Sequence, residues 1–310
     1  MKKHLFLILT TLMAIATGAK ADVEINETNF PDPNFRNYLL GRENWNGQGD
    51  GVFSETEIEE MWEIRVEGKG VKNLKGIEFF PNIWRLYCYN NQLTSLDLSN
   101  NPNLYDFNCA NNQLTSLDLS KNPALVELKC GGNRLNALDV SKNTKLKLIS
   151  CSYNQLHSLD LSNNVELLEL IINNNYIKGA QMEALIASLP FYNRNNQTRA
   201  GYYNHYITVK STDYDENVCT KKHVQSILAR GWEAYSLNGY ELEPYEGINP
   251  PGDLNGDGEV NSADVQRLYA IMASSSVGGG GYDPEADLNG DGLLNSADVQ
   301  RLYAIMAGRW

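Results

Sequence analysis

Two acidic loops near the end of this 310-residue chain carry its clearest chemistry. They span residues 253–264 and 287–298, and carboxylate and amide side chains recur at alternate positions in both. Side-chain oxygens at positions 1, 3, 5, 9 and 12 of such a loop, with the backbone carbonyl of position 7, suit Ca²⁺. The predicted ligands are Asp253, Asn255, Asp257, Glu259, Asn261 and Asp264 in the first loop, and Asp287, Asn289, Asp291, Leu293, Asn295 and Asp298 in the second.

The spacing in both loops is that of the calcium loop of an EF-hand. Gly258 and Gly292 occupy position 6, where the chain turns sharply, and an apolar residue follows at position 8. Each loop leads into a segment of helical pattern, and residues 261–273 recur without change as residues 295–307. Prolines precede the first loop and a Ser/Gly-rich tract precedes the second, so no entering helix is expected. The repeated unit is therefore one loop followed by one helix.

The last 60 residues resemble a type I dockerin, the module that docks onto cohesin domains of cellulosome-like assemblies in a Ca²⁺-dependent way. The resemblance implies two bound Ca²⁺ ions and a cohesin-bearing scaffold protein as partner. It also implies a docking face from equivalent residues of the two units, namely Ser262, Ala263, Tyr269, Ala270, Ser296, Ala297, Tyr303 and Ala304. Because the units are so alike, a partner could bind in two orientations related by a half-turn. The alternative is a small module that Ca²⁺ merely holds together, with no partner.

A third loop, at residues 46–57, keeps the same frame but has amide side chains at positions 1 and 3. The loss of two carboxylates weakens Ca²⁺ binding. We therefore expect either a low-affinity site for a third Ca²⁺ or a loop that keeps only its shape. The candidate ligands are Asn46, Gln48, Asp50, Val52, Ser54 and Glu57.

A repeating pattern fills the middle of the chain. Cys88, Cys109, Cys130 and Cys151 recur every 21 residues, each within the frame apolar-x-x-apolar-x-Cys-x-x-Asn-x-Leu. This is a leucine-rich repeat, in which each coil adds one short parallel strand to a solenoid. We expect the apolar residues and the asparagines to form inward columns. The cysteines have no C-x-x-C clustering, which favours buried thiols over disulfides or metal ligands.

Together these patterns resemble a secreted bacterial leucine-rich-repeat protein with a C-terminal type I dockerin module. The predicted fold class is an α/β leucine-rich-repeat solenoid with parallel strands and capping segments, plus a small all-α calcium-binding module of paired loop-helix units. We expect a signal peptide at residues 1–21, an N-terminal cap at 22–82, the repeats at 83–178, a C-terminal cap with a helix and a β-hairpin at 179–248, and the dockerin at 249–310.

The N-terminus has the layout of a secretory signal peptide. Lys2 and Lys3 precede an apolar run over residues 5–16, and small residues follow at Ala19 and Ala21. Removal of residues 1–21 would take three lysines away and shift the formal net charge from −12 to −15. Nucleic acid and anionic membranes are poor partners for so acidic a chain. No later apolar stretch reaches the roughly 18 residues of a membrane span, so we expect a secreted protein, extracellular or held at the cell surface through a scaffold.

No cluster of acid, base and nucleophile predicts catalysis, because the four histidines are scattered along the chain. The outward face of the strands is where such solenoids bind partners. Its aromatic side chains gather at the first full coil, in Trp84, Tyr87 and Tyr89, and with Arg85 they form the candidate binding group of the repeat face.

We therefore expect a secreted, non-catalytic binding protein that is linked to polysaccharide breakdown only through its dockerin. Its repeats would recognise a protein or a glycan. The alternative is an adhesin-like or host-interacting leucine-rich-repeat protein whose terminal module is only a calcium-stabilised knob.

Overall fold

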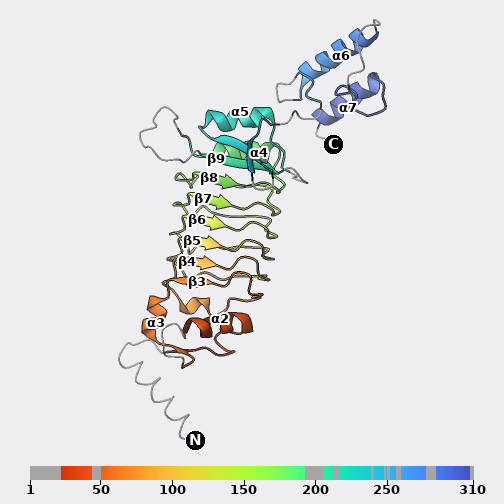
Figure 1. The fold of residues 1–310 in the computed structure, drawn as a ribbon. Coiled ribbons are helices and arrows are strands. Elements are labelled where there is room, and N and C mark those ends of the chain that lie inside the picture. The colour runs from red at the N-terminus through yellow and green to blue at the C-terminus, as the bar shows by residue number, and fades with distance from the viewer. Residues whose placement is uncertain are drawn as a thin grey trace, which may run out of the picture.

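The computed structural model describes residues 22–43, 50–192, 205–211, 217–238, 241–247, 249, 252–255, 260–276 and 284–307. They form an elongated solenoid with a cap at each end and two helices beyond the C-terminal cap (Figure 1). This is the predicted fold class. No helix among the described residues is both long and apolar enough to cross a membrane. The predicted signal peptide lies outside the described residues.

One continuous sheet runs along the solenoid, and its strands follow one another in chain order. The strict register pairs Leu86 with Phe107 and Phe107 with Leu128, so the repeat length places equivalent residues of successive coils side by side. The sheet ends in β11 (Glu241–Pro244), which pairs antiparallel with β10. The parallel strands are β3 (Glu63–Arg65), β4 (Arg85–Tyr87), β5 (Asp106–Asn108), β6 (Glu127–Lys129), β7 (Leu148–Ser150), β8 (Glu169–Ile171), β9 (Tyr206–Ser211) and β10 (Glu233–Asn238).

The middle residue of each repeat strand points into the solenoid. These residues are 0% exposed and form the predicted apolar column: Leu86, Phe107, Leu128, Ile149 and Leu170. The four repeat cysteines form a second column, and each is a free, fully buried thiol. Burial raises the pKa of these thiols, so they stay protonated and pack as small apolar side chains. The prediction of buried thiols is confirmed.

A column of buried asparagines joins neighbouring coils. The side-chain amide of Asn133 donates to the carbonyl oxygens of Cys109 and Cys130, both at 3.0 Å. Its Oδ1 accepts the backbone N–H of Leu114, also at 3.0 Å. Asn112 and Asn154 make the same three contacts one coil away on either side. One side chain therefore satisfies buried polar groups of its own coil and of the preceding coil.

The residue before each of these asparagines has left-handed backbone geometry. Asn90, Asn111, Tyr153 and Asn174 have φ between 53° and 56°, and Gly132 has φ of 66°. Asparagine and glycine tolerate this region, whereas tyrosine adopts it at a cost. Tyr153 points its ring into solvent and is 56% exposed.

Phenylalanine rings seal the N-terminal end of the solenoid. Phe53 meets Phe80 edge to face at 5.2 Å, Phe30 meets Phe35 at 5.9 Å, and all four rings are fully buried. The apolar column is therefore not open to water at this end. The elements of this cap are β1 (Val23–Glu24), α2 (Pro33–Glu43), β2 (Val52–Phe53), α3 (Glu55–Glu60) and the 3₁₀ turn η1 (Ile77–Phe79).

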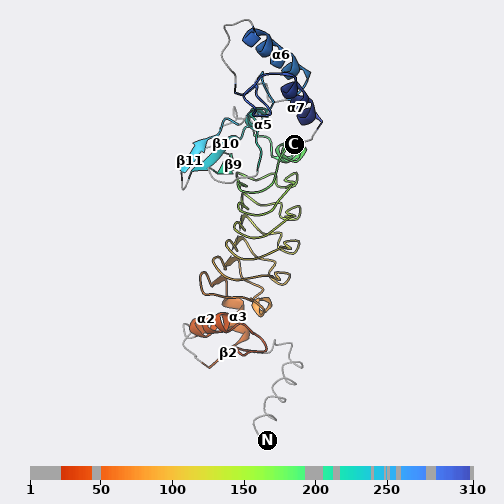
Figure 2. The same cartoon turned by 90° about the vertical axis from the view of Figure 1, so that its right-hand side faces the viewer.

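The C-terminal cap combines α4 (Ala180–Ser188), α5 (Lys221–Ala229) and strands β9 to β11. Trp232 is fully buried at its centre, and the indole Nε1 donates to the Pro190 carbonyl at 2.9 Å. Strands β10 and β11 form the predicted hairpin, although Gly239 of its turn lies outside the described residues. The hairpin projects sideways from the stack of coils (Figure 2).

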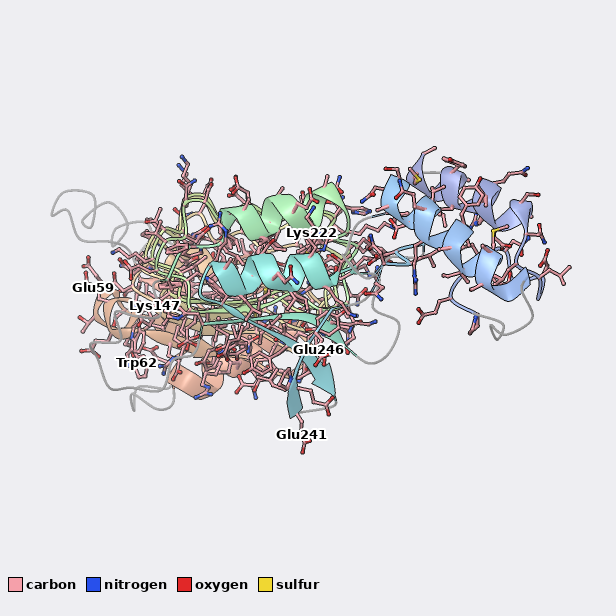
Figure 3. All side chains as sticks on the ribbon, turned by 90° about the horizontal axis from the view of Figure 1, so that it is seen from above. Glu59, Trp62, Lys147, Lys222, Glu241 and Glu246 are labelled. Carbon is pink, nitrogen blue, oxygen red and sulfur yellow. The ribbon has the colours of Figure 1, made fainter. Side chains whose placement is uncertain are left out.

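The helices α6 (Ser262–Ser276) and α7 (Ser296–Met306) lie beyond this cap (Figure 3). They share a small apolar core in which Val265 and Leu268 of α6 join Val299 and Leu302 of α7. This core is distinct from the one that runs through the solenoid and its caps.

The asparagine column predicts a large stability difference between two neighbouring substitutions. Asn133→Ala should destabilise the solenoid by about 1–3 kcal/mol, because it leaves the buried Leu114 N–H without a partner and removes one of two asparagine donors from the carbonyls of Cys109 and Cys130. Asp139→Ala is the matched control, since Asp139 is exposed and bonds Ser141 within its own turn, accepting the Ser141 N–H at 2.9 Å. Urea unfolding followed by circular dichroism would measure both, and equal losses would contradict the role given to the column.

Candidate metal centre and docking face

The second C-terminal loop is wrapped around Asp287. Its Oδ1 accepts the backbone N–H of Gly290 at 2.8 Å and of Asp291 at 3.2 Å, and its Oδ2 accepts that of Gly292 at 2.8 Å. Gly290 and Gly292 have φ of 73° and 81°, a geometry in which glycine is not strained. Asp287 is 9% exposed, so backbone donors hold its charge inside the loop.

Position 12 of each loop holds a fully buried aspartate, Asp264 or Asp298. Oδ1 of Asp298 accepts the N–H of Leu288 at 3.0 Å and of Asn289 at 3.4 Å, and its Oδ2 accepts that of Asn295 at 2.8 Å. Asp264 makes the equivalent three contacts in the first loop. Each carboxylate thus ties the start of its loop to the start of the following helix, and the two units repeat in geometry as well as in sequence.

The donor atoms of the second loop suit a hard divalent cation. Asp287, Asp291, Asp298, Asn289 and Asn295 offer side-chain oxygens without any sulfur or imidazole, and the predicted seventh-position ligand is a backbone carbonyl. The three carboxylates repel one another in one short loop, and a dication would relieve that repulsion. No three His, Cys, Asp or Glu side chains of the described residues form a metal cluster by themselves. A complete site therefore needs the amide and carbonyl oxygens as well.

The structure describes only part of the first C-terminal loop, residues 253–255 and 260–264. Asp253 is 5% exposed and Asn261 accepts the N–H of Ala263 at 2.8 Å, as Asn295 accepts that of Ala297. Asp257 and Glu259 lie outside the described residues, so the full ligand set of this loop remains a prediction.

The described residues of the N-terminal loop form part of the N-terminal cap. Oε2 of Glu57 accepts both the N–H and the hydroxyl of Ser54 at 2.8 Å, which forms the capping box at the start of α3. Asp50 accepts the N–H of Val52 at 3.0 Å, and β2 pairs with β1. Asn46 and Gln48 lie outside the described residues, so a third Ca²⁺ site stays a prediction.

The predicted docking residues lie on the two C-terminal helices. Tyr269 of α6 and Tyr303 of α7 are each 53% exposed, which is high for so large an aromatic residue. Ser262, Ala263, Ala270 and Ser296 are also exposed, whereas Ala297 and Ala304 are half-buried. Two equivalent but not identical surfaces are therefore available to a partner.

Three of the four residues singled out on the solenoid face meet one another. The guanidinium of Arg85 lies 4.4 Å from the ring centre of Trp84 and 5.7 Å from that of Tyr87. Arg85 also contacts Glu63 at 3.3 Å, so its charge is already paired. Burial and a hydrogen bond to Asp106 raise the pKa of Tyr87 to about 12. Tyr89 is half-buried, and a binding role for this group stays a prediction.

The sequence reasoning missed two tyrosines of the C-terminal cap, Tyr206 and Tyr235, which line a groove together with Tyr105 of the repeats. The hairpin that holds Tyr235 was predicted, but only the parallel pairing of β9 with β8, and of β10 with β9, brings both tyrosines to the repeat face. The one available signal was the alternation of polar with apolar residues in these two strands.

Comparisons with known proteins divide the chain into two parts. Residues 251–306 match the type I dockerin domain family. No curated protein sequence matches the chain. An internalin (inlF) from Listeria monocytogenes has 20% identity and a TM-score of 0.52, with 80% of this chain and 63% of that one covered. This likeness shows the fold alone, and the chain spans less than two thirds of that internalin.

Two further solved structures align less well. An internalin C2 from the same organism has 16% identity and a TM-score of 0.42, over 62% of this chain and 90% of that one. A leucine-rich-repeat protein from Leptospira interrogans has 26% identity and a TM-score of 0.34, over 37% and 31% of the two chains.

The solenoid and the C-terminal match together define the class. The chain is a leucine-rich-repeat protein with a C-terminal type I dockerin module. Type I dockerins bind calcium and dock onto cohesins, so the C-terminal part of the chain is a binding module.

Calcium should stabilise the C-terminal module without affecting the solenoid, because the two have separate apolar cores. Thermal unfolding of the full chain should show two transitions. A chelator should lower the midpoint temperature of the smaller transition only. At free Ca²⁺ 100 times above Kd, each site adds about 2.7 kcal/mol. Circular dichroism at increasing Ca²⁺ would check this. Restoration by Mg²⁺ at the same concentration would contradict a calcium loop, because Mg²⁺ demands a tighter octahedral site.

Proposed function

We propose that this chain is a secreted, non-catalytic binding subunit. Its dockerin docks Ca²⁺-dependently onto a cohesin-bearing scaffold protein of a cellulosome-like or cell-surface complex, while the repeats hold a protein or a glycan. The observation that carries the proposal is the dockerin match over residues 251–306, together with two loop-helix units of equivalent geometry. A link to polysaccharide breakdown comes through the partner complex and not through catalysis by this chain.

Two Ca²⁺ ions would sit in the two C-terminal loops, held by the oxygen donors named above. Support comes from the buried aspartates at positions 1 and 12, which the loop backbone already orients. A metal held this way links the start of each loop to the helix that carries the docking residues.

Docking in either of two orientations follows from the repeated helices. A cohesin that receives Tyr269 and its neighbours on α6 would meet Tyr303 and an equivalent surface on α7 after a half-turn. Because Ala297 and Ala304 are half-buried whereas Ala263 and Ala270 are exposed, we expect the α6 orientation to be favoured.

The N-terminal sequence supports the proposed role outside the cell. The N-terminal layout of lysines, apolar run and small residues is typical of a signal peptide, and docking partners of this kind act outside the cell.

The docking proposal is tested with a panel of recombinant type I cohesins and the full chain. At least one cohesin should bind in Ca²⁺ and be released by chelator, and Asp253→Ala combined with Asp287→Ala should abolish binding because both loops lose a central ligand. Tyr153→Ala is the matched control, since this exposed tyrosine lies on a repeat turn away from the module. Binding would be measured by calorimetry.

Single and double tyrosine variants test the two orientations. Tyr269→Ala or Tyr303→Ala alone should leave binding through the other helix, whereas the double variant should lose about 30-fold or more in affinity. Failure of every cohesin to bind, with Ca²⁺ still bound tightly, would favour an adhesin-like protein with a calcium-stabilised knob.

A further inference from the structure

A groove lies on the sheet face where the repeats meet the C-terminal cap. Its volume is about 880 Å³, within the range of about 300–1,000 Å³ for ligand sites. Tyr105, Lys147 and Leu168 of the repeats line one side, and Tyr206, Tyr235 and Leu242 of the cap line the other. Tyr235 and Leu242 both belong to the projecting hairpin, and Glu241 lies toward its outer end (Figure 3).

The tyrosines of the groove are held in fixed positions. The rings of Tyr206 and Tyr235 meet edge to face, with centres 5.9 Å apart and planes at 84°. The Tyr235 hydroxyl donates to Glu233 at 2.8 Å. Burial and a hydrogen bond to Glu169 raise the pKa of Tyr206, so its hydroxyl stays protonated. Both rings therefore present ordered apolar surface beside a polar group.

The charged side chains that line the groove already have partners. Glu127 pairs with Lys129 at 3.1 Å, and Lys147 pairs with Glu166 at 3.8 Å. The Glu169 carboxylate bonds the Tyr206 hydroxyl. A polyanion would meet the carboxylates of Glu127 and Glu169, and a polycation would have to compete with Lys129 and Lys147, so a strongly charged ligand of either sign is disfavoured. A ligand that is neutral, rich in hydroxyl groups and partly apolar fits this lining better than either.

We propose that this groove binds a neutral oligosaccharide. The proposal rests on the binding role given to the repeats and specifies its ligand class. Tyr206 and Tyr235 pack against the C–H faces of sugar rings, while Glu127 and Glu169 accept hydrogen bonds from sugar hydroxyls. The half-buried Leu168 provides an apolar floor.

The aromatic lining continues beyond the groove. The ring of Tyr105, 43% exposed, meets Trp84 at 6.1 Å, and Trp84 stacks on Trp62 at 5.5 Å. All three are exposed residues that stand just before strands of successive coils. A longer glycan chain can therefore follow the face across several coils, so affinity should rise with chain length.

The test is calorimetry of the full chain with cellohexaose, xylohexaose and mannohexaose, and with hexagalacturonate and hexalysine as charged probes. At least one neutral hexasaccharide should bind, and more tightly than its disaccharide. Tyr235→Ala should weaken binding at least about tenfold. Tyr206→Phe keeps the ring but removes the hydroxyl that bonds Glu169, and should cause a smaller loss of affinity. Tyr153→Ala should change nothing, and thermal unfolding would verify that all variants fold.

The same titrations on the Asp253→Ala, Asp287→Ala double variant separate this proposal from docking. Glycan binding should survive in that variant although cohesin binding is lost. Binding of hexagalacturonate or hexalysine alone, no binding of any neutral probe, or binding that Tyr235→Ala leaves unchanged would each overturn the proposal. Docking onto a cohesin would stand in every one of these cases.

Discussion

The hydrogen bonds of the asparagine column are the constraint on which the whole solenoid depends. A strand of three residues is too short to hold a coil in place by its ladder alone, and every coil must also turn sharply at a left-handed residue. Asn133 and its equivalents satisfy the backbone groups that this turn would bury unpaired. The apolar and cysteine columns then stack in register because the asparagines fix the spacing between coils.

A regular stack exposes its two ends, and the caps solve this problem in different ways. The N-terminal cap closes the stack with phenylalanine rings and takes a calcium-type loop into its packing through Phe53. The C-terminal cap instead continues the sheet through β9 and β10 before β11 reverses it. Pro244 and the glutamates of β11 discourage further strand pairing at this edge.

Much of this organisation could be predicted from the sequence, because repeats report on packing directly. The 21-residue period predicted the columns of Leu128 and Asn133, and the paired acidic loops predicted two equivalent loop-helix units. The groove could not be predicted. It depends on Tyr235, which reaches the repeat face only because β9 pairs with β8 and β10 then pairs with β9. Nor does the spacing of residues reveal that Arg85 is already neutralised by Glu63.

The docking helices lie beyond the C-terminal end of the stack, and the groove spans the coils from Tyr105 to the C-terminal cap, whereas the coils before Tyr105 lie outside the groove (Figure 1). Whole coils are therefore interchangeable units of length. A gene duplication of one 21-residue segment that carries β4 would shift the N-terminal cap by one strand spacing, about 4.8 Å, and preserve the register of every other coil. Relatives that differ in reach could thus retain one attachment geometry.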